Sequence, residues 1–154
     1  MQTTDTIWIA APPEQVFRHA SDVERWPDIL PHYRWVRLRE RRADGAAIVE
    51  MAAWRPFGPF RWPTWWMSEM WVRRNQLEVR YRHVRGVTTG MDVVWSIVAE
   101  GSGSRATIVH EWKGPPWPLI RGPVADWVIG PVFVRGIASR TLAGIGRAAE
   151  AGHA

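Results

Sequence analysis

The chain has 154 residues, no cysteine, 12 tryptophans and a formal net charge of +5. This length is typical of one domain that buries about two thirds of its unfolded surface, and the lack of cysteine excludes disulfide frameworks and thiolate metal or redox sites. No segment reaches the ~20 apolar residues of a membrane-spanning helix, and the polar residues 1–5 lack the pattern of a secretory signal. We therefore expect one cytoplasmic domain over residues 1–154.

The first part of the chain predicts a strand followed by two short helices. Ile7–Ala10 is a short apolar run that predicts a strand, and Pro13 is typical of the first turn of a helix over Pro13–Ala20. A second short helix is expected over Val23–Trp26 and should end at Pro27, because the residue before a proline disfavours the helical conformation.

From Trp35 onward the hydrophobic period changes to two, which predicts antiparallel strands. A first strand should run from Trp35 to a turn at Asp44 and Gly45. The segment 55–61 contains two prolines and one glycine, so we expect a loop or a distorted sheet edge there. The remaining strands are expected over Ala46–Trp54, Trp62–Arg73, Leu77–Arg85, Met91–Ala99 and Arg105–Lys113.

The one long helical pattern covers Val124–Ala151, with a kink or broken start expected at Pro131. Runs of strands that are separate from the helices indicate an α+β fold. We expect a strongly curved antiparallel sheet of about six to seven strands wrapped around the C-terminal helix. A helix that touches a curved sheet along one stripe leaves space at one end, which predicts a pocket.

Tryptophan is the most unusual component, with six of the 12 residues between Trp54 and Trp95 in segments that predict strands. Indoles can fill a core, line a cavity for a flat apolar ligand or form an adhesive rim, and we favour the cavity. Strand alternation predicts which side chains point inward. The expected lining is Trp66, Ser68, Met70, Tyr81, His83, Trp95, His110 and Trp112.

Three of these residues are candidates for chemistry. His83 and His110 could act as a general acid or base, and Tyr81 could hydrogen-bond a carbonyl or a developing enolate. Each of them could instead be an ordinary buried residue. The five histidines show no metal-ligand spacing, and the chain has no phosphate-binding loop or nucleophile elbow, so we expect neither a metal nor a cofactor.

The segment 55–66 interleaves aromatic residues with arginine on a backbone rich in proline and glycine. It could cover the pocket, make a transient contact with a membrane surface, form a dimer patch, or simply fold its rings onto the sheet edge. The remaining arginines are dispersed, which argues against nucleic-acid binding. A monomer and a homodimer are both compatible with the sequence.

Three local strings resemble the START-like superfamily, also called SRPBCC, and within it the polyketide cyclase/dehydrase and lipid-transport group. They are Ile9–Phe17 at the first strand and helix, Asp22–Pro27 at the second helix, and the C-terminal helix with Ile137, Thr141, Leu142 and Ile145. The resemblance implies a helix-grip fold that holds a hydrophobic ligand between the sheet and the long helix. Members of the group cyclise polyketides or carry quinones or lipids.

Two functions follow from the residues and the resemblance together. The first is a carrier or binding protein for a hydrophobic small molecule such as a lipid, a quinone or an aromatic polyketide-like compound. The alternative is a polyketide cyclase/aromatase or dehydratase that acts on a bound poly-keto intermediate. The resemblance to cyclases implies an interior arginine or tyrosine, but the inward face expected for Trp62–Arg73 carries no arginine. Arg55 and Arg61 are expected only at the pocket rim.

Overall fold

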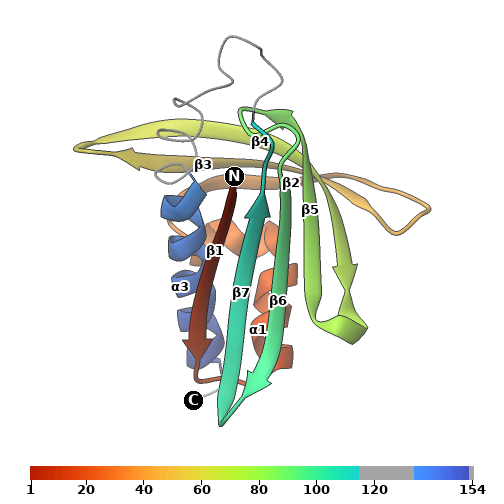
Figure 1. Cartoon of the computed structure of the whole chain (residues 1–154), viewed down its shortest axis with the longest axis vertical. Helices are drawn as coiled ribbons and strands as arrows, with labels where there is room; N and C mark the ends of the chain where they lie inside the picture. Colours follow the sequence, from red (N-terminus) through yellow and green to blue (C-terminus); the bar gives the residue numbers. More distant parts are fainter. Residues whose placement is uncertain (115–133, 153–154) are drawn as a thin grey trace.

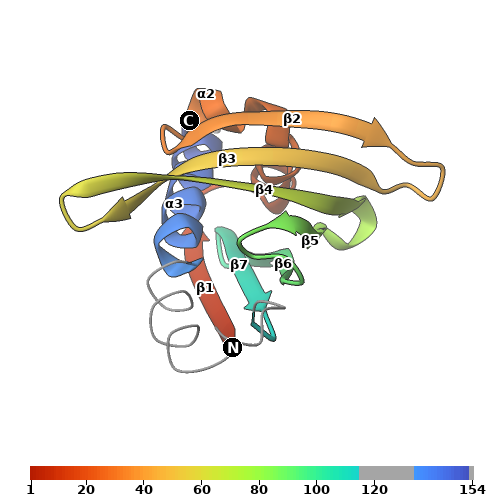
Figure 2. The same cartoon turned by 90° about the horizontal axis from the view of Figure 1, so that it is seen from above.

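We describe residues 1–114 and 134–152 of a computed structural model (Figures 1 and 2). The expected kink at Pro131 and the expected helical residues 124–133 lie outside these ranges. The described elements are β1 Gln2–Ile9, α1 Pro13–Ser21, the 3-10 turn η1 Val23–Arg25, α2 Trp26–Ile29, β2 Tyr33–Arg41, β3 Ala47–Phe57, β4 Phe60–Arg73, the 3-10 turn η2 Arg74–Gln76, β5 Glu78–Gly86, β6 Asp92–Glu100, β7 Gly103–Glu111 and α3 Arg135–Ala151.

All seven described strands form one antiparallel sheet in the order β1-β7-β6-β5-β4-β3-β2. Figure 2 shows the sheet bending around α3, with β2, β3 and β4 on one side of the helix and β1 and β7 on the other. The helix accordingly contacts β1 at one end of the strand order and β3 near the other end. This arrangement confirms the predicted α+β helix-grip fold with two short helices after the first strand.

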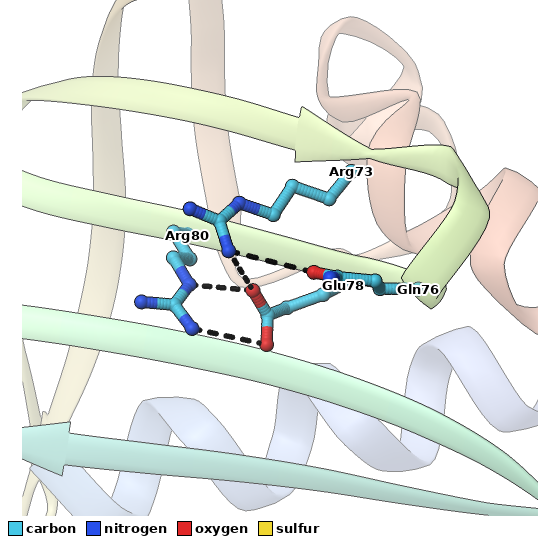
Figure 3. A network of polar contacts seen from close by, with 4 residues as sticks. All are labelled: Arg73, Gln76, Glu78 and Arg80. Carbon is cyan, nitrogen blue, oxygen red and sulfur yellow. Dashed lines mark hydrogen bonds and ion pairs between the residues drawn. The ribbon is translucent and has the colours of Figure 1, made fainter.

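Alternation along the strands separates an apolar inner face from a charged outer face, as the sequence predicts. On β5, Val79 and Tyr81 are buried while Arg80 and Arg82 are exposed. Outer-face charges pair with one another: Arg80 Nε donates to Glu78 at 2.5 Å, and Arg73 lies 3.5 Å from the same carboxylate (Figure 3). These contacts, the hydrogen bond from Arg80 above all, lower the pKa of Glu78. The basic side chains of this face are therefore partly neutralised by neighbours.

Of the two expectations for residues 55–61, a loop or a distorted sheet edge, the loop is wrong, because β3 and β4 continue as a paired hairpin to a turn at Gly58 and Pro59. We call residues 54–65 the hairpin tip. Beyond Ala53, β3 has no register partner in β2, and before Trp66, β4 has no register partner in β5. A proline in the tip therefore removes no hydrogen bond to a third strand, which explains why proline does not end these strands.

Two further boundaries differ from the prediction. β1 begins at Gln2 rather than Ile7, because its polar residues pair along the whole of β7. The helix expected to stop before Pro27 is a 3-10 turn followed by a short α-helix that contains Pro27 in its first turn. Proline is tolerated there because its missing N–H would have no partner within the helix.

The C-terminal half of α3 approaches its neighbours closely because it carries glycines at the contacts. A Cβ atom at Gly144 would lie 2.2 Å from the Leu30 side chain, and one at Gly146 would lie 3.4 Å from Ile9. Both Leu30 and Ile9 are fully buried. A side chain at 144 would therefore displace the end of the Leu30 side chain, by which helix α3 packs against the α2 region.

Two polar contacts hold the same half of the helix. Gln15 donates to the carbonyl of Ala149 at 3.2 Å, and the Ala10 amide donates to the Glu150 carboxylate at 3.0 Å. Together with the glycine contacts, they hold residues 144–150 of α3 close to β1 and α1.

We predict that Gly144→Ala lowers the free energy of unfolding by about 1–3 kcal/mol, although alanine is the better helix former, because Leu30 has to leave its packed position. Gly136→Ala is the matched control, since a Cβ atom there meets no atom within 4 Å. We expect Gly136→Ala to leave the free energy of unfolding unchanged or to raise it by up to ~1 kcal/mol. Urea unfolding of both variants measures the difference, and equal effects would refute the close packing at residue 144.

Candidate functional site

A cavity lies between the inner face of the sheet and the N-terminal half of α3. The space that the centres of water molecules can occupy in it is about 90 Å³, and the whole hollow, with the part continuous with solvent, is about 690 Å³. One water needs roughly 10–15 Å³ on the first measure. The described lining residues are Trp26, Tyr33, Met51, Arg55, Thr64, Trp65, Trp66, Tyr81, His83, Val87, Thr88, Met91, Val93, Trp95, Ile108, His110, Val134, Ile137, Ala138 and Thr141.

Five rings form a continuous series along the wall of the cavity, which we call the aromatic wall: Trp95, Trp26, Tyr33, Trp66 and His83. Successive ring centroids lie between 5.1 and 6.1 Å apart. The Trp66 and His83 rings are nearly parallel, at 19°. Such spacings are typical of attractive aromatic contacts, and they leave ring faces and edges available to a flat molecule.

The tyrosines place hydroxyl groups in this wall. Tyr81 Oη is buried and has no hydrogen-bond partner in the described structure. Burial, with a smaller contribution from nearby Tyr33, raises the pKa of Tyr81 well above its ordinary value. Burial likewise raises the pKa of Tyr33, and nearby Thr141 lowers it by a smaller amount. Both hydroxyls are therefore protonated donors at neutral pH, and the Tyr81 donor is available to a ligand acceptor.

The two inward histidines are neutral. Burial lowers the pKa of His83 to about 3, with a smaller effect from nearby His110, and burial lowers the pKa of His110 to about 4. Nδ1 of His83 shares a hydrogen bond of 2.5 Å with the Thr88 hydroxyl, and Nδ1 of His110 lies 3.5 Å from the Thr3 hydroxyl. These contacts engage Nδ1 of each ring and leave Nε2 to other partners.

Arg55 is the cationic side chain of the described cavity wall. It lies on β3 and is only 4% exposed. Burial lowers its pKa to about 9, so the guanidinium stays charged at neutral pH. Arg55 therefore adds a positive charge to a described wall that otherwise consists largely of aromatic rings, apolar side chains and neutral imidazoles.

Five of the eight predicted lining residues stand in the cavity wall: Trp66, Tyr81, His83, Trp95 and His110. Ser68, Met70 and Trp112 face inward as expected, but they are packed in the core and do not reach the cavity. The indole of Trp112 instead donates to the Thr89 carbonyl at 3.0 Å. The ligand-binding role of these residues, and the catalytic role of Tyr81, His83 and His110, stays a prediction.

Arg55 was expected only at the pocket rim, because its segment was predicted to be a loop or a distorted sheet edge, but it lies in the cavity wall. Ala53 and Met51 precede it at alternate, buried positions of the same strand face, so the alternation that predicts β3 also predicts Arg55 inward once the strand is extended. Thr141, one of the C-terminal helix residues on which the family resemblance rests, faces the cavity.

The hairpin tip exposes aromatic rings. Phe60 is 70% exposed and Trp62 is 65% exposed, so the interpretation that these rings fold back onto the sheet is wrong. Trp66, just past the tip, does turn into the cavity. The expected transient membrane contact and the expected dimer patch at residues 55–66 stay predictions. No helix in the described ranges is both long enough and apolar enough to span a bilayer.

The comparisons with known proteins agree with this geometry. Residues 9–134 match the family model described as polyketide cyclase / dehydrase and lipid transport. The chain belongs to this family. A protein of Streptomyces cyaneus named "Putative polyketide cyclase" is 30% identical over 116 residues, which cover 74% of each chain.

Members of the wider START-like fold are also similar in structure. TTHA0849 from Thermus thermophilus has a TM-score of 0.81 at 19% identity and covers 100% of both chains. The Zhui aromatase/cyclase from Streptomyces sp. R1128 has a TM-score of 0.74 at 19% identity over 96% of this chain and 93% of that one. A START superfamily protein from Mycobacterium smegmatis has a TM-score of 0.67 at 18% identity, and the match covers 99% of this chain and 96% of that chain. At these identities the similarity shows the fold of this polyketide cyclase/dehydrase family member.

Because His83 and His110 are neutral in the folded protein, we predict that its stability depends on pH. Their folded-state pKa values lie below the ordinary value of 6.5, so the unfolded chain binds protons first as the pH falls. Stability should be complete above about pH 6.5 and should decrease towards pH 4, by about 1–2 kcal/mol per histidine at pH 5. Urea unfolding at pH 7, 6 and 5 tests this, with His110→Gln expected to give the flatter profile. Parallel profiles would remove His110 as a contributor.

Proposed function

We propose that this chain works as a single START-like ligand-binding domain that holds a flat, largely apolar small molecule with carbonyl or hydroxyl oxygens in the cavity. The observation that carries the proposal is the aromatic wall, with the Tyr81 hydroxyl buried beside it and lacking a hydrogen-bond partner among the described residues. A buried donor without a partner costs about 1–3 kcal/mol, and a ligand oxygen would remove that cost.

The size and polarity of the cavity narrow the ligand class. At about 90 Å³ it holds a small guest as it stands, and a ligand of several fused rings needs side chains of the wall to move outward. The tyrosines and histidines carry no charge at neutral pH, so they favour a ligand with neutral oxygens near them. A polycyclic aromatic compound or a quinone fits these requirements better than a lipid with a long saturated chain, which gains nothing from aromatic stacking.

Filling the cavity should abolish ligand binding while the fold persists. Ala138 lies in the cavity wall and is 4% exposed, so Ala138→Phe places a ring in the space that the ligand would use. Native mass spectrometry of freshly purified protein should detect an apolar compound in the original chain and none in this variant. Ala99→Phe, at an exposed strand position, is the control and should retain the compound. Equal retention by both variants would place the ligand elsewhere.

A cyclase/aromatase activity is the second candidate, because Arg55, His83 and His110 line the same cavity. In an aldol closure, a neutral imidazole would take a proton from a methylene carbon between two carbonyls. The resulting enolate, with its oxygen near Arg55, would form a carbon–carbon bond to a second carbonyl carbon, whose oxygen then receives the proton from the imidazolium. This sequence consumes no net proton and needs no cofactor.

The lowered pKa values favour the carrier over the enzyme. An imidazole with a pKa of about 3 or 4 is a weak base at neutral pH, whereas general bases work best with a pKa near the working pH. A hydrogen-bonding role requires only a neutral imidazole, which is the form that burial favours.

The double variant Tyr81→Phe, His110→Ala separates the two candidates. For a carrier, we expect affinity for the co-purified compound to fall about five- to tenfold, since one or two neutral hydrogen bonds are lost. For a cyclase, turnover of a poly-keto substrate should fall ~10²-fold or more while binding persists. Turnover that stays unchanged would exclude both side chains from the reaction, and unchanged affinity would exclude them from binding.

A further inference from the structure

A second hollow lies outside the cavity, between the start of β2, the hairpin tip and the outer face of α3. The space that the centres of water molecules can occupy in this hollow is about 340 Å³. We call it the basic groove. Its described lining residues are Leu30, Pro31, His32, Trp54, Arg61, Arg140, Ala143 and Arg147.

Three arginines from separate parts of the chain converge on this groove. Arg61 comes from the hairpin tip, and Arg140 and Arg147 come from α3. A fourth, Arg34, stacks over the Trp54 ring at 4.7 Å from its centroid, which places another cation beside the groove. No acidic side chain is among the described lining residues. The described part of the groove therefore concentrates positive charge without an internal counter-charge.

Five arginines outside the groove are paired with glutamates, whereas others, such as Arg82 and Arg85, form no ion pair in the described ranges. Arg39, Arg42, Arg73, Arg80 and Arg105 each form an ion pair with a glutamate. None of the three groove arginines forms an ion pair with a residue in the described ranges.

The positive charges of Arg140 and Arg147 affect His32, which lies at the floor of the groove. His32 is buried there, and Nε2 lies 3.0 Å from the Thr141 hydroxyl. Thr141 donates to the Ile137 carbonyl, so its oxygen accepts from His32 Nε2–H. Burial, followed by Arg140 and Arg147, lowers the pKa of His32 to about 4. The imidazole is neutral at pH 7, which leaves the arginines as the source of positive charge.

We propose that the basic groove binds a phosphate group, with Arg61, Arg140 and Arg147 as its ligands. A guanidinium presents a planar fork of donors that matches the oxygens of phosphate or carboxylate. A single carboxylate has two oxygens and one charge, which one arginine satisfies. Three arginines around one groove suit a group with more oxygens and up to two negative charges, which is a phosphate ester.

The site is separate from the proposed ligand cavity. The His32–Thr141 pair stands between them, because Thr141 lines the cavity and His32 lines the groove. Phosphate binding therefore does not depend on the proposed cavity function. The phosphate could belong to a soluble ester or to a phospholipid headgroup.

Glycerol 3-phosphate is the soluble probe, and titration with it should be followed by calorimetry and by the NMR signals of the His32 ring. We expect saturable binding with a dissociation constant below ~1 mM and a shift of the His32 signals. Arg140→Gln with Arg147→Gln should weaken binding at least tenfold. The matched control, Arg82→Gln with Arg85→Gln, removes the same charge from exposed positions outside the groove and should change affinity less than twofold.

Vesicles of phosphatidylcholine, with and without phosphatidylglycerol, distinguish the two sources. Binding of glycerol 3-phosphate assigns the groove to soluble phosphate esters. Binding only to phosphatidylglycerol vesicles, lost in the groove variant and kept in the control, assigns it to a lipid headgroup. The proposal is overturned if the original chain binds neither probe, or if both double variants weaken binding equally, which would indicate a general effect of net charge.

Discussion

The distance between α3 and the sheet changes along the helix, and the cavity depends on this change. In the C-terminal half, glycine at 144 and 146 lets the backbone approach Leu30 and Ile9. A hydrogen bond from the Gln15 side chain, and one that the Glu150 carboxylate accepts from the Ala10 amide, hold it there. In the N-terminal half, Ala138 and Thr141 face an unfilled space instead. A helix that packed equally closely along its whole length would leave no cavity, so the glycines that appear to weaken α3 are what allow one end to close and the other to remain open.

The cavity combines a large aromatic surface with few charges. Its tyrosines and histidines are held in their neutral forms by burial, and Arg55 brings a positive charge into the described wall. The basic groove has the opposite character, with several cations and little aromatic surface beyond Trp54. The described structure therefore contains two hollows of different chemical character, divided by the hydrogen bond between His32 and Thr141.

Much of the fold follows from sequence because its signals are local. A period of two places Val79, Tyr81 and His83 on the inner face of β5, and spacing of three and four places Ala138 and Thr141 on the buried face of α3. Periodicity identifies the face of a strand but not the depth at which a side chain lies. Ser68 and Met70 thus share a face with Trp66 but pack in the core beyond the cavity.

The site was harder to predict where local and tertiary signals conflict. Pro56 and Pro59 are typical of a loop, but the tip lies beyond the neighbouring strands and loses no ladder bonds, so the strand persists and carries Arg55 inward. The convergence of Arg61 with Arg140 and Arg147 depends on how the tip crosses the helix, and nothing in the local sequence of either segment indicates that contact.

The hairpin tip has one more consequence, which concerns association between molecules. A two-stranded ribbon with free backbone edges and exposed rings is an open template for another chain's strand, and such edges promote aggregation. Pro56 and Pro63 have no N–H to offer along these edges. Pro56 and Pro63 thus oppose the pairing of a further strand with this ribbon, which displays the exposed rings of Phe60 and Trp62.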